Sequence, residues 1–302
     1  MWLIFALATT LIWGTGELFY KKGSHPGEKY GHLKVCICVG AVMGAHAVFM
    51  LLTQDIGYSF SNLLIYMPVS LCYIISMAFS FFGVRFIEES ISDPIENTSG
   101  AIVCLMCAVL LGEEIAPGAV VAVILILIGI LGVGFLESRG DTDRRKLLGK
   151  RMAVLAFSMP FCYAILDALG TFLDIYYLDI ATSPLKGVTE DTIENVANTS
   201  YELTFAICAL VLLVFMKIRG VQFDLPKQRD KLVAAVCETG GQFTYVFAMS
   251  GNGAIAAPII SSVCVVSLLL SRIVLKEKLT TKQYFFIAMV IAGILILGTM
   301  DA

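Results

Sequence analysis

The chain has 302 residues, of which 58% are hydrophobic and only 15% are charged. Soluble domains carry roughly 25% charged residues, so this composition excludes an ordinary soluble protein and indicates one that lives in a membrane. The formal net charge of −3 says little by itself, and no basic face with interleaved aromatic residues indicates nucleic-acid binding.

Ten apolar runs follow one another along the chain, and a helix of about 20 such residues crosses a bilayer. We expect membrane-spanning helices at residues 2–20, 33–53, 62–83, 93–112, 117–137, 152–175, 200–216, 231–250, 253–275 and 281–299. No basic segment precedes the first run, so we interpret it as a helix and not as a cleaved signal peptide. The sequence therefore predicts an all-α integral membrane protein with ten transmembrane helices.

Lys and Arg are confined to every second connection between these helices. Twenty of the 21 lie in or beside the first, third, fifth, seventh and ninth connections, whereas the even ones hold only Lys186 and several acidic residues. Positively charged loops are retained in the cytoplasm. The pattern therefore predicts that the basic connections, including the highly charged linker 138–151, are cytoplasmic and that both termini are extracytoplasmic.

The second half of the chain repeats part of the first half at a distance of 164 residues. With that shift three distinctive residues fall on identical ones: Pro94 on Pro258, Glu113 on Glu277 and Gly129 on Gly293. Each half holds five helices, an odd number, so the two would be inverted repeats, residues 1–137 and 152–302, joined by the linker. Inverted repeats recur in secondary transporters, where one half rocks against the other around a midplane site.

Several motifs resemble the drug/metabolite transporter superfamily, in particular its EamA-like ten-helix branch. They are Trp13-Gly14 followed by Lys21, and two similar helix ends, one at residues 111–113 leading to Gly129 and one at residues 275–280 leading to Gly293. The resemblance covers essentially the whole chain and implies a transporter of small metabolites such as amino acids, drug-like cations or sugars. It also implies cytoplasmic termini, and here we keep the opposite orientation that the charges predict.

We therefore expect a secondary active transporter of the cell membrane that moves an amino acid, amine or drug-like solute by alternating access, with protons as a candidate coupling ion. A sugar or nucleoside-type permease and a non-transporting sensor or scaffold stay open as alternatives, as do a monomer and a homodimer. The chain has no GxxxxGK[ST] loop, which excludes ATP-driven pumping by this chain. With three histidines and neither HExxH nor GxSxG, no enzymatic activity, cofactor or metal site is expected.

Acidic residues inside apolar runs are the first candidates for a substrate or proton site, because a charge near a helix centre costs on the order of several kcal/mol. Asp167 lies deep in the sixth helix, with Tyr163 one turn before it, and we take both as candidates. Asp174 lies nearer the end of that helix, so we expect it to be solvated.

Glu238 and Gln242 are the candidates in the eighth helix. The glycines at 240–241 between them indicate a loosened or closely approached helix. Alternatively, Glu238 reaches the inner surface and pairs with Lys231 or Arg85.

Two further glutamates have a structural alternative. Glu17 either lines the cavity, with Gly14 and Gly16 letting a ligand approach, or pairs with Lys21 one turn later. Glu96 either points into the cavity or closes a capping box at a helix that begins at Asp93.

His46, near the middle of the second helix, is either a packing residue or part of a proton relay if it neighbours Asp167 or Glu238. Five aromatic residues could line a pocket: Trp13, Tyr20, Tyr163, Phe243 and Tyr245. Cys104 and Cys107 have the spacing of a redox or zinc pair, but we expect them to be small apolar side chains of a helix.

Overall fold

The computed structural model describes residues 1–23, 28, 30–83, 89–137, 150–274 and 279–299, and only the backbone of residues 21, 89–91, 137, 150–157 and 271. Over these residues the structure is all-helical. Its elements are α1 (Trp2–Gly23), α2 (Gly31–Thr53), α3 (Ser61–Gly83), α4 (Glu89–Glu96), α5 (Ser99–Met106), the π-helical turn η1 (Cys107–Leu111), α6 (Pro117–Glu137), α7 (Lys150–Leu178), α8 (Ile193–Ile218), the 3₁₀ turn η3 (Leu225–Gln228), α9 (Arg229–Ile260), α10 (Val263–Val274) and α11 (Thr281–Thr299).

The prediction of ten transmembrane helices is confirmed. Among the described residues, nine helical stretches are long and apolar enough to cross a membrane. The tenth span arises because α9 is two helices, interrupted by non-helical backbone at Asn252 (φ −162°, ψ 73°). The residues after Asn252 continue through α10 as the ninth span, so the eighth and ninth helices follow one another without a loop.

One predicted boundary is wrong by seven residues. We expected the seventh helix to begin at residue 200, but α8 begins at Ile193. Ile193, Val196 and Ala197 are buried, and their i, i+3, i+4 spacing places them on one helical face. Packing of this face against the core extends the helix through a stretch whose polar residues suggested a loop.

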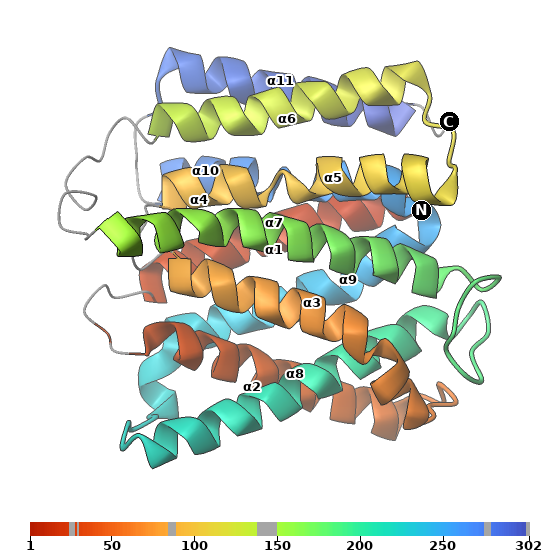
Figure 1. Cartoon of the computed structure of the whole chain (residues 1–302), viewed down its shortest axis with the longest axis vertical. Helices are drawn as coiled ribbons and strands as arrows, with labels where there is room; N and C mark the ends of the chain where they lie inside the picture. Colours follow the sequence, from red (N-terminus) through yellow and green to blue (C-terminus); the bar gives the residue numbers. More distant parts are fainter. Residues whose placement is uncertain (24–27, 29, 84–88, 138–149, 275–278, 300–302) are drawn as a thin grey trace.

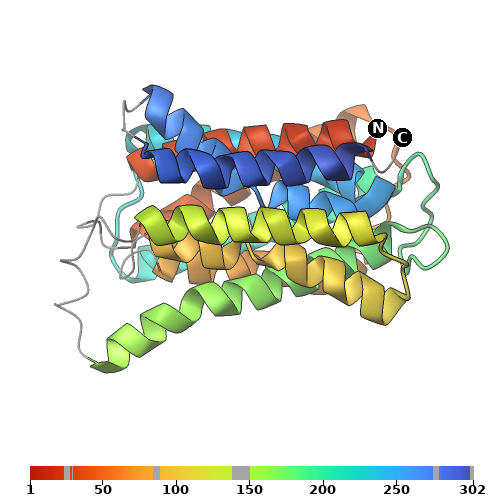
Figure 2. The same cartoon turned by 90° about the horizontal axis from the view of Figure 1, so that it is seen from above.

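The helices form an elongated bundle of side-by-side rods (Figure 1). The α6–α11 pair lies at one end of its long axis and the α2–α8 pair at the other, with α1, α3, α7 and α9 between them; Figure 2 shows the same bundle from above. The helix ends fall at two surfaces. One, called here the terminal end, holds the start of α1 and the loop between α7 and α8, and the opposite linker end holds the start of α7.

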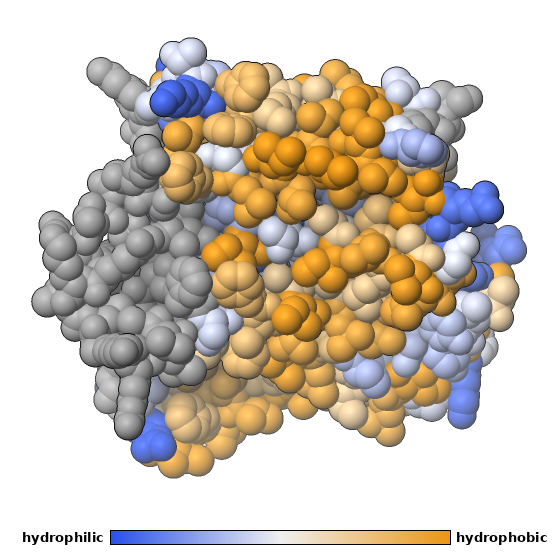
Figure 3. Space-filling view, turned by 45° about the horizontal axis from the view of Figure 1, so that its top comes forward, coloured by the Kyte–Doolittle hydropathy of each residue, from blue (hydrophilic) through white to orange (hydrophobic). Residues whose placement is uncertain are grey.

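The side of the bundle carries the apolar surface that lipid requires. Figure 3 shows hydrophobic residues over its middle and hydrophilic residues toward the two helix-end surfaces. Large side chains such as Leu105, Val109, Ile165 and Val211 are each more than 60% exposed. Exposed apolar area on this scale marks a membrane-facing surface.

The crossing of α6 and α11 has two-fold symmetry. A Cβ atom at Gly129 would lie 2.8 Å from the carbonyl oxygen of Phe286, and one at Gly293 would lie 2.8 Å from the carbonyl oxygen of Ala122. Shifting the first contact by 164 residues gives the second, because Gly129 maps onto Gly293 and Ala122 onto Phe286. The two helices are antiparallel, as inverted repeats require.

The same correspondence appears where two of the helices break. The break between α4 and α5 is closed by a hydrogen bond from Thr98 Oγ1 to the carbonyl of Ile95 at 2.7 Å. The break between α9 and α10 is closed by a bond from Ser262 Oγ to the carbonyl of Ile259 at 2.6 Å. These residues are again 164 apart. The contacts are those of two oppositely threaded repeats, while the boundaries 1–137, 138–151 and 152–302 stay a prediction.

Candidate functional site

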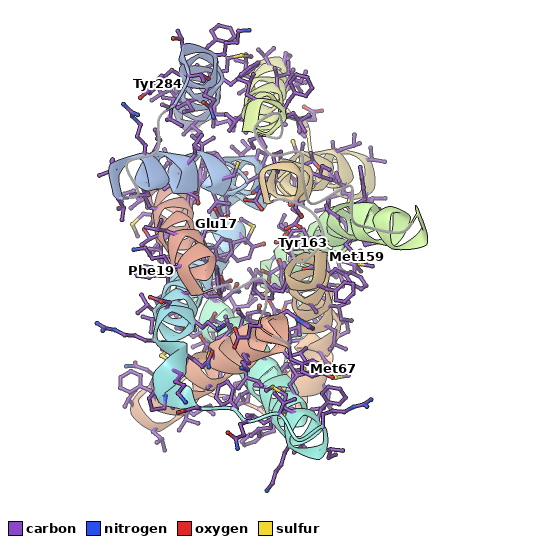
Figure 4. The ribbon with its side chains drawn as sticks, turned by 90° about the vertical axis from the view of Figure 1, so that its left-hand side faces the viewer. Glu17, Phe19, Met67, Met159, Tyr163 and Tyr284 are labelled. Carbon is purple, nitrogen blue, oxygen red and sulfur yellow. The ribbon has the colours of Figure 1, made fainter. Side chains whose placement is uncertain are left out.

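A cavity of about 210 Å³ lies in the interior of the bundle. Its lining comes from both halves of the chain: Trp13, Glu17 and Tyr20 of α1; Tyr73, Met77, Ser80 and Phe81 of α3; Asp93, Glu96, Asn97, Ser99 and Gly100 around the α4–α5 break; Tyr163, Asp167 and Thr171 of α7; Tyr201 of α8; and Glu238, Gln242, Tyr245, Ala257, Ile260, Ser261 and Val263 at α9 and after it. In Figure 4, a view from the linker end, Glu17 and Tyr163 lie on opposite sides of the centre.

Six of the seven candidate residues line this cavity, namely Glu17, Glu96, Tyr163, Asp167, Glu238 and Gln242. The seventh, His46, does not. The two broken helices meet beside the cavity, where the backbone N–H of Gly100 donates to Ser261 Oγ at 3.0 Å. A Cβ atom at Gly100 would lie only 2.6 Å from the carbonyl of Ala257, so this close crossing requires glycine.

The α7 side of the cavity is a polar stripe. Tyr163, Asp167 and Thr171 are four residues apart, so they share one helical face. Tyr163 and Ser99 hydrogen-bond to the Asp167 carboxyl. Asp167 is thus oriented from its own helix and from α5.

Glu238 is held by two residues of α1. Its Oε2 accepts a hydrogen bond from the Tyr20 hydroxyl at 3.4 Å, and its backbone carbonyl accepts one from Trp13 Nε1 at 3.2 Å. The alternative in which Glu238 pairs with Lys231 is wrong, because Lys231 Nζ binds Glu28 Oε2 at 2.9 Å. The alternative with Arg85 lies outside the described residues.

Glu96 lines the cavity and does not close a capping box. The α4 helix begins at Glu89, four residues before Asp93, and Pro94 lies inside it. The carboxyl of Glu96 is buried and accepts a hydrogen bond from Ser92 Oγ at 2.6 Å. The proposed helix start was wrong because the helix extends back through residues whose polarity suggested a loop.

The glycines beside two of the acids serve helix packing. A Cβ atom at Gly14 would lie 2.6 Å from Val266, and one at Gly16 would lie 3.1 Å from Cys237, so neither opens space for a ligand beside Glu17. The alternative partner of Glu17, the Lys21 side chain, lies outside the described residues. In contrast, the close approach expected at 240–241 is present at Gly241, where a Cβ atom would lie 2.3 Å from the Trp13 indole.

Aromatic rings form much of the remaining wall. Trp13 and Tyr245 have ring centroids 5.3 Å apart, and Tyr20 and Phe81 have centroids 5.5 Å apart. The fifth aromatic candidate, Phe243, does not line the cavity and instead packs edge-on against His46.

His46 is partly buried and belongs to a separate cluster between α2 and α8. Its Nδ1 lies 2.8 Å from both carboxyl oxygens of Glu202, and Asn198 Nδ2 donates to Glu202 Oε1 at 3.0 Å. His46 therefore neighbours neither Asp167 nor Glu238. The cluster joins the two halves beside the cavity.

Two residues that sequence reasoning misplaced or missed are Asp174 and Glu202. Asp174 is completely buried, so the expectation that it is solvated was wrong, and Glu202 is also completely buried. Glu202 was overlooked because it falls just inside a helix whose start was placed too late. The pattern Asn198-x-x-x-Glu202, opposite an intramembrane His, was the available signal.

Among the described residues that line the cavity there are acids but no Lys, Arg or His. In the described part of the chain, no group of three or more His, Cys, Asp or Glu is arranged to hold a metal ion. Cys104 and Cys107 are buried, and all nine cysteines are free thiols. The described lining offers carboxyl, hydroxyl and aromatic groups to a ligand.

Part of the sequence matches a known family, and the whole fold matches a solved structure. The model of the EamA-like transporter family matches residues 186–299. A solved structure described only as "Crystal structure of protein" has the same fold, with a TM-score of 0.75 at 13% identity over 99% of this chain and 96% of that chain. No curated protein matches the chain.

The ten-span bundle is that of a multi-pass membrane protein, and the family match indicates a membrane transporter. Residues 186–299 match the EamA-like transporter family, which the motifs also resemble and which is a family of transporters and not of enzymes.

Proposed function

We propose that this transporter is a secondary active carrier of small organic cations or zwitterions, such as amines and amino acids, across the cell membrane. The observation that supports this most is the composition of the cavity wall, whose described residues include acids and aromatic rings but no basic side chain. An anionic substrate would meet only like charges there.

The wall provides two kinds of group that bind an ammonium ion. Carboxylates such as Asp167 and Glu238 accept charge-assisted hydrogen bonds. Trp and Tyr rings attract a cation placed over their faces, with an interaction of about 2 kcal/mol when water is excluded. Trp13, Tyr20 and Tyr245 are within the same lining, so one ligand can meet both.

The size of the cavity favours a small solute. Pockets for drug-sized ligands measure roughly 300–1,000 Å³, whereas this one is about 210 Å³. An amino acid or a compact amine fits this space better than a polycyclic drug.

The same acids provide a means of proton coupling. Glu17, Glu96, Asp167 and Glu238 lie near enough to interact electrostatically, and like charges in a low-dielectric site cannot all be ionised together. Without a substrate, some of these carboxyls hold protons. An entering cation neutralises these carboxyls in place of the protons. The protons are then released, so the transporter exchanges substrate for protons.

Alternating access would use the inverted halves 1–137 and 152–302. For orientation, we propose that the linker end is cytoplasmic and the terminal end extracytoplasmic. Lys22, Lys34, Lys217, Arg219 and Lys227 are all near the linker end, whereas Lys186 is in the α7–α8 loop at the terminal end. This distribution follows the positive-inside rule.

A two-stage experiment tests the proposal. Purified protein is first screened by thermal shift against amino acids, polyamines, quaternary amines, sugars and nucleosides, because a ligand of the native state raises its apparent stability. Hits are then assayed for transport in proteoliposomes with and without a pH gradient. We expect cationic or zwitterionic hits and gradient-dependent transport.

Glu238→Gln and Asp167→Asn should both weaken transport, whereas Asp191→Asn, at an exposed acid of the α7–α8 loop, should not. Stabilisation by sugars or nucleosides alone would overturn the cation proposal. Equal transport with and without the gradient would overturn proton coupling while leaving the substrate class intact.

A further inference from the structure

We propose that Asp174 is a second proton-binding site, which exchanges protons with the central cavity through hydroxyl groups of Tyr73, Tyr245 and Thr171. The inference deepens the proposed function, since it rests on proton coupling at the cavity and names an additional residue for it.

Asp174 is an acid without the partners that a buried carboxylate normally has. It is completely buried in α7. The Tyr66 hydroxyl donates to its Oδ1, while its Oδ2 has no hydrogen-bond partner among the described residues. No Lys, Arg or His in the described part of the chain forms an ion pair with it. An isolated carboxylate in a membrane interior is costly, so this environment favours a carboxyl that takes up a proton.

The groups that face Asp174 are hydroxyls. Tyr66 and Tyr73 reach it from α3, and Tyr245 of α9 lies close enough to interact electrostatically. The other acid of this helix face, Asp167, is seven residues away, about 10 Å along the helix axis. A proton cannot cross that distance in one step, so exchange between the two acids needs intermediate groups.

Three hydroxyls occupy the space between them. The phenol oxygens of Tyr73 and Tyr245 are 2.7 Å apart. Both phenols also lie within hydrogen-bonding distance of Thr171 Oγ1, at 3.1 Å for Tyr73 and 2.9 Å for Tyr245. All three residues line the cavity, and Tyr73 also lies near enough to Asp174 to interact with it, so the chain of hydroxyls leads from the cavity to the buried acid.

The three hydroxyls of Tyr73, Tyr245 and Thr171 can also reorient, as a proton relay requires. Each of the three oxygens carries one hydrogen and can accept as well as donate. Three contacts share three rotatable hydrogens, so the hydrogen bonds can run in more than one direction without movement of the backbone.

A proton in the cavity binds to the Tyr245 oxygen while Tyr245 gives its own hydrogen to Tyr73. Tyr73 in turn gives its hydrogen to the Asp174 carboxylate. Each hydroxyl ends with as many hydrogens as before, and the net change is one proton moved from the cavity to Asp174.

A test without any substrate uses pH-difference infrared spectroscopy on the purified protein, because a protonated carboxyl has a C=O stretching band that a carboxylate lacks. We expect Asp174→Asn to remove one such band, and Asp191→Asn to leave all of them. After transfer to D₂O, the Asp174 band shifts when its proton exchanges. Tyr73→Phe and Tyr245→Phe should slow that shift by on the order of tenfold or more.

Tyr177→Phe is the matched control, because Tyr177 packs against the ring of Tyr66 but is not part of the hydroxyl chain. The proposal is overturned if Asp174→Asn removes no band. It is also overturned if the band exchanges equally fast in Tyr73→Phe, Tyr245→Phe and Tyr177→Phe, which would leave Asp174 only the structural role of holding α7 against α3. Neither result depends on a transported solute, so both leave the proposed cation binding to its own test.

Discussion

Substituting alanine for Gly129 or for Gly293 tests the two-fold crossing of α6 and α11. In each case the added Cβ atom would lie 2.8 Å from a backbone carbonyl oxygen of the other helix, and 2.4 Å from Val290 for Gly129 or 2.7 Å from Ile126 for Gly293. An ordinary contact needs at least about 3.4 Å. The side chains can rotate away but the carbonyls cannot, so the two helices must separate by roughly half an ångström.

The expected cost follows from two opposing effects. Overpacking of a tight interface costs about 1–3 kcal/mol, while replacing a helical glycine by alanine gains up to about 1 kcal/mol. Each single variant should therefore lose up to about 2 kcal/mol of unfolding free energy, which lowers the melting temperature by at most about 4–8 °C. Because the distances to the carbonyls are equal, the losses at Gly129 and Gly293 should agree closely.

Thermal unfolding in detergent at a fixed scan rate measures these effects. Gly240→Ala is the control, because its Cβ atom would have no neighbour closer than 3.8 Å, and it should leave the melting temperature unchanged or raise it. The double variant should lose less than the sum of the single losses, since helices already separated accommodate the second methyl group. Strong destabilisation at one glycine with none at the other would refute the symmetric crossing.

Three other changes test the remaining contacts and the orientation. His46→Ala should lower stability by about 1–3 kcal/mol, because it leaves the buried carboxyl of Glu202 with fewer hydrogen bonds; an unchanged melting temperature would contradict this. Burial raises the pKa of Glu28, but hydrogen bonds from two lysines outweigh burial and hold the pKa below its ordinary value of 4.5. The ionised Glu28 side chain therefore stabilises the folded protein fully above pH 4.5, and this contribution is lost as the pH falls through the lower pKa of the folded state. When the pH is lowered from 7, the Glu28→Gln variant should therefore lose less stability than the parent protein. Equal losses in the two proteins would show that ionised Glu28 does not contribute to stability. Membrane-impermeant thiol reagents should label Lys186→Cys in intact cells but not a cysteine placed in 138–149, in a background without reactive native cysteines; the reverse would invert the orientation.

The sequence predicted the arrangement of spans well, because a bilayer imposes a length and a polarity on every helix that crosses it. It also identified most of the acids at the cavity, since an acid is expensive in lipid and is retained mainly where it faces a polar interior. Glu238 and Asp167 are such cases. Their partners were not predictable, because Trp13 and Tyr20 meet Glu238 only through the packing of helices more than 200 residues apart in the chain.

The errors lie at helix ends. Asp174 was placed in solvent and a capping box stayed open as an alternative for Glu96, because both residues are near the limits of apolar runs, where hydropathy changes gradually. Tertiary packing extended α8 and α4 beyond the apolar segments, which buried polar residues that local sequence assigns to loops. His46 shows the complementary difficulty, since its partner Glu202 lies in the other half of the chain.

The absence of a loop between the eighth and ninth spans has a mechanical consequence. Asn252 is the single non-helical residue inside α9, so these two arms have no slack between them. The part of α9 after Asn252 crosses the α4–α5 break. If it tilts, either the backbone torsions at Asn252 change, or the part of α9 that carries Glu238, Gln242 and Tyr245 moves with it. Lengthening this joint by a few glycines would uncouple the two arms while leaving every wall residue in place.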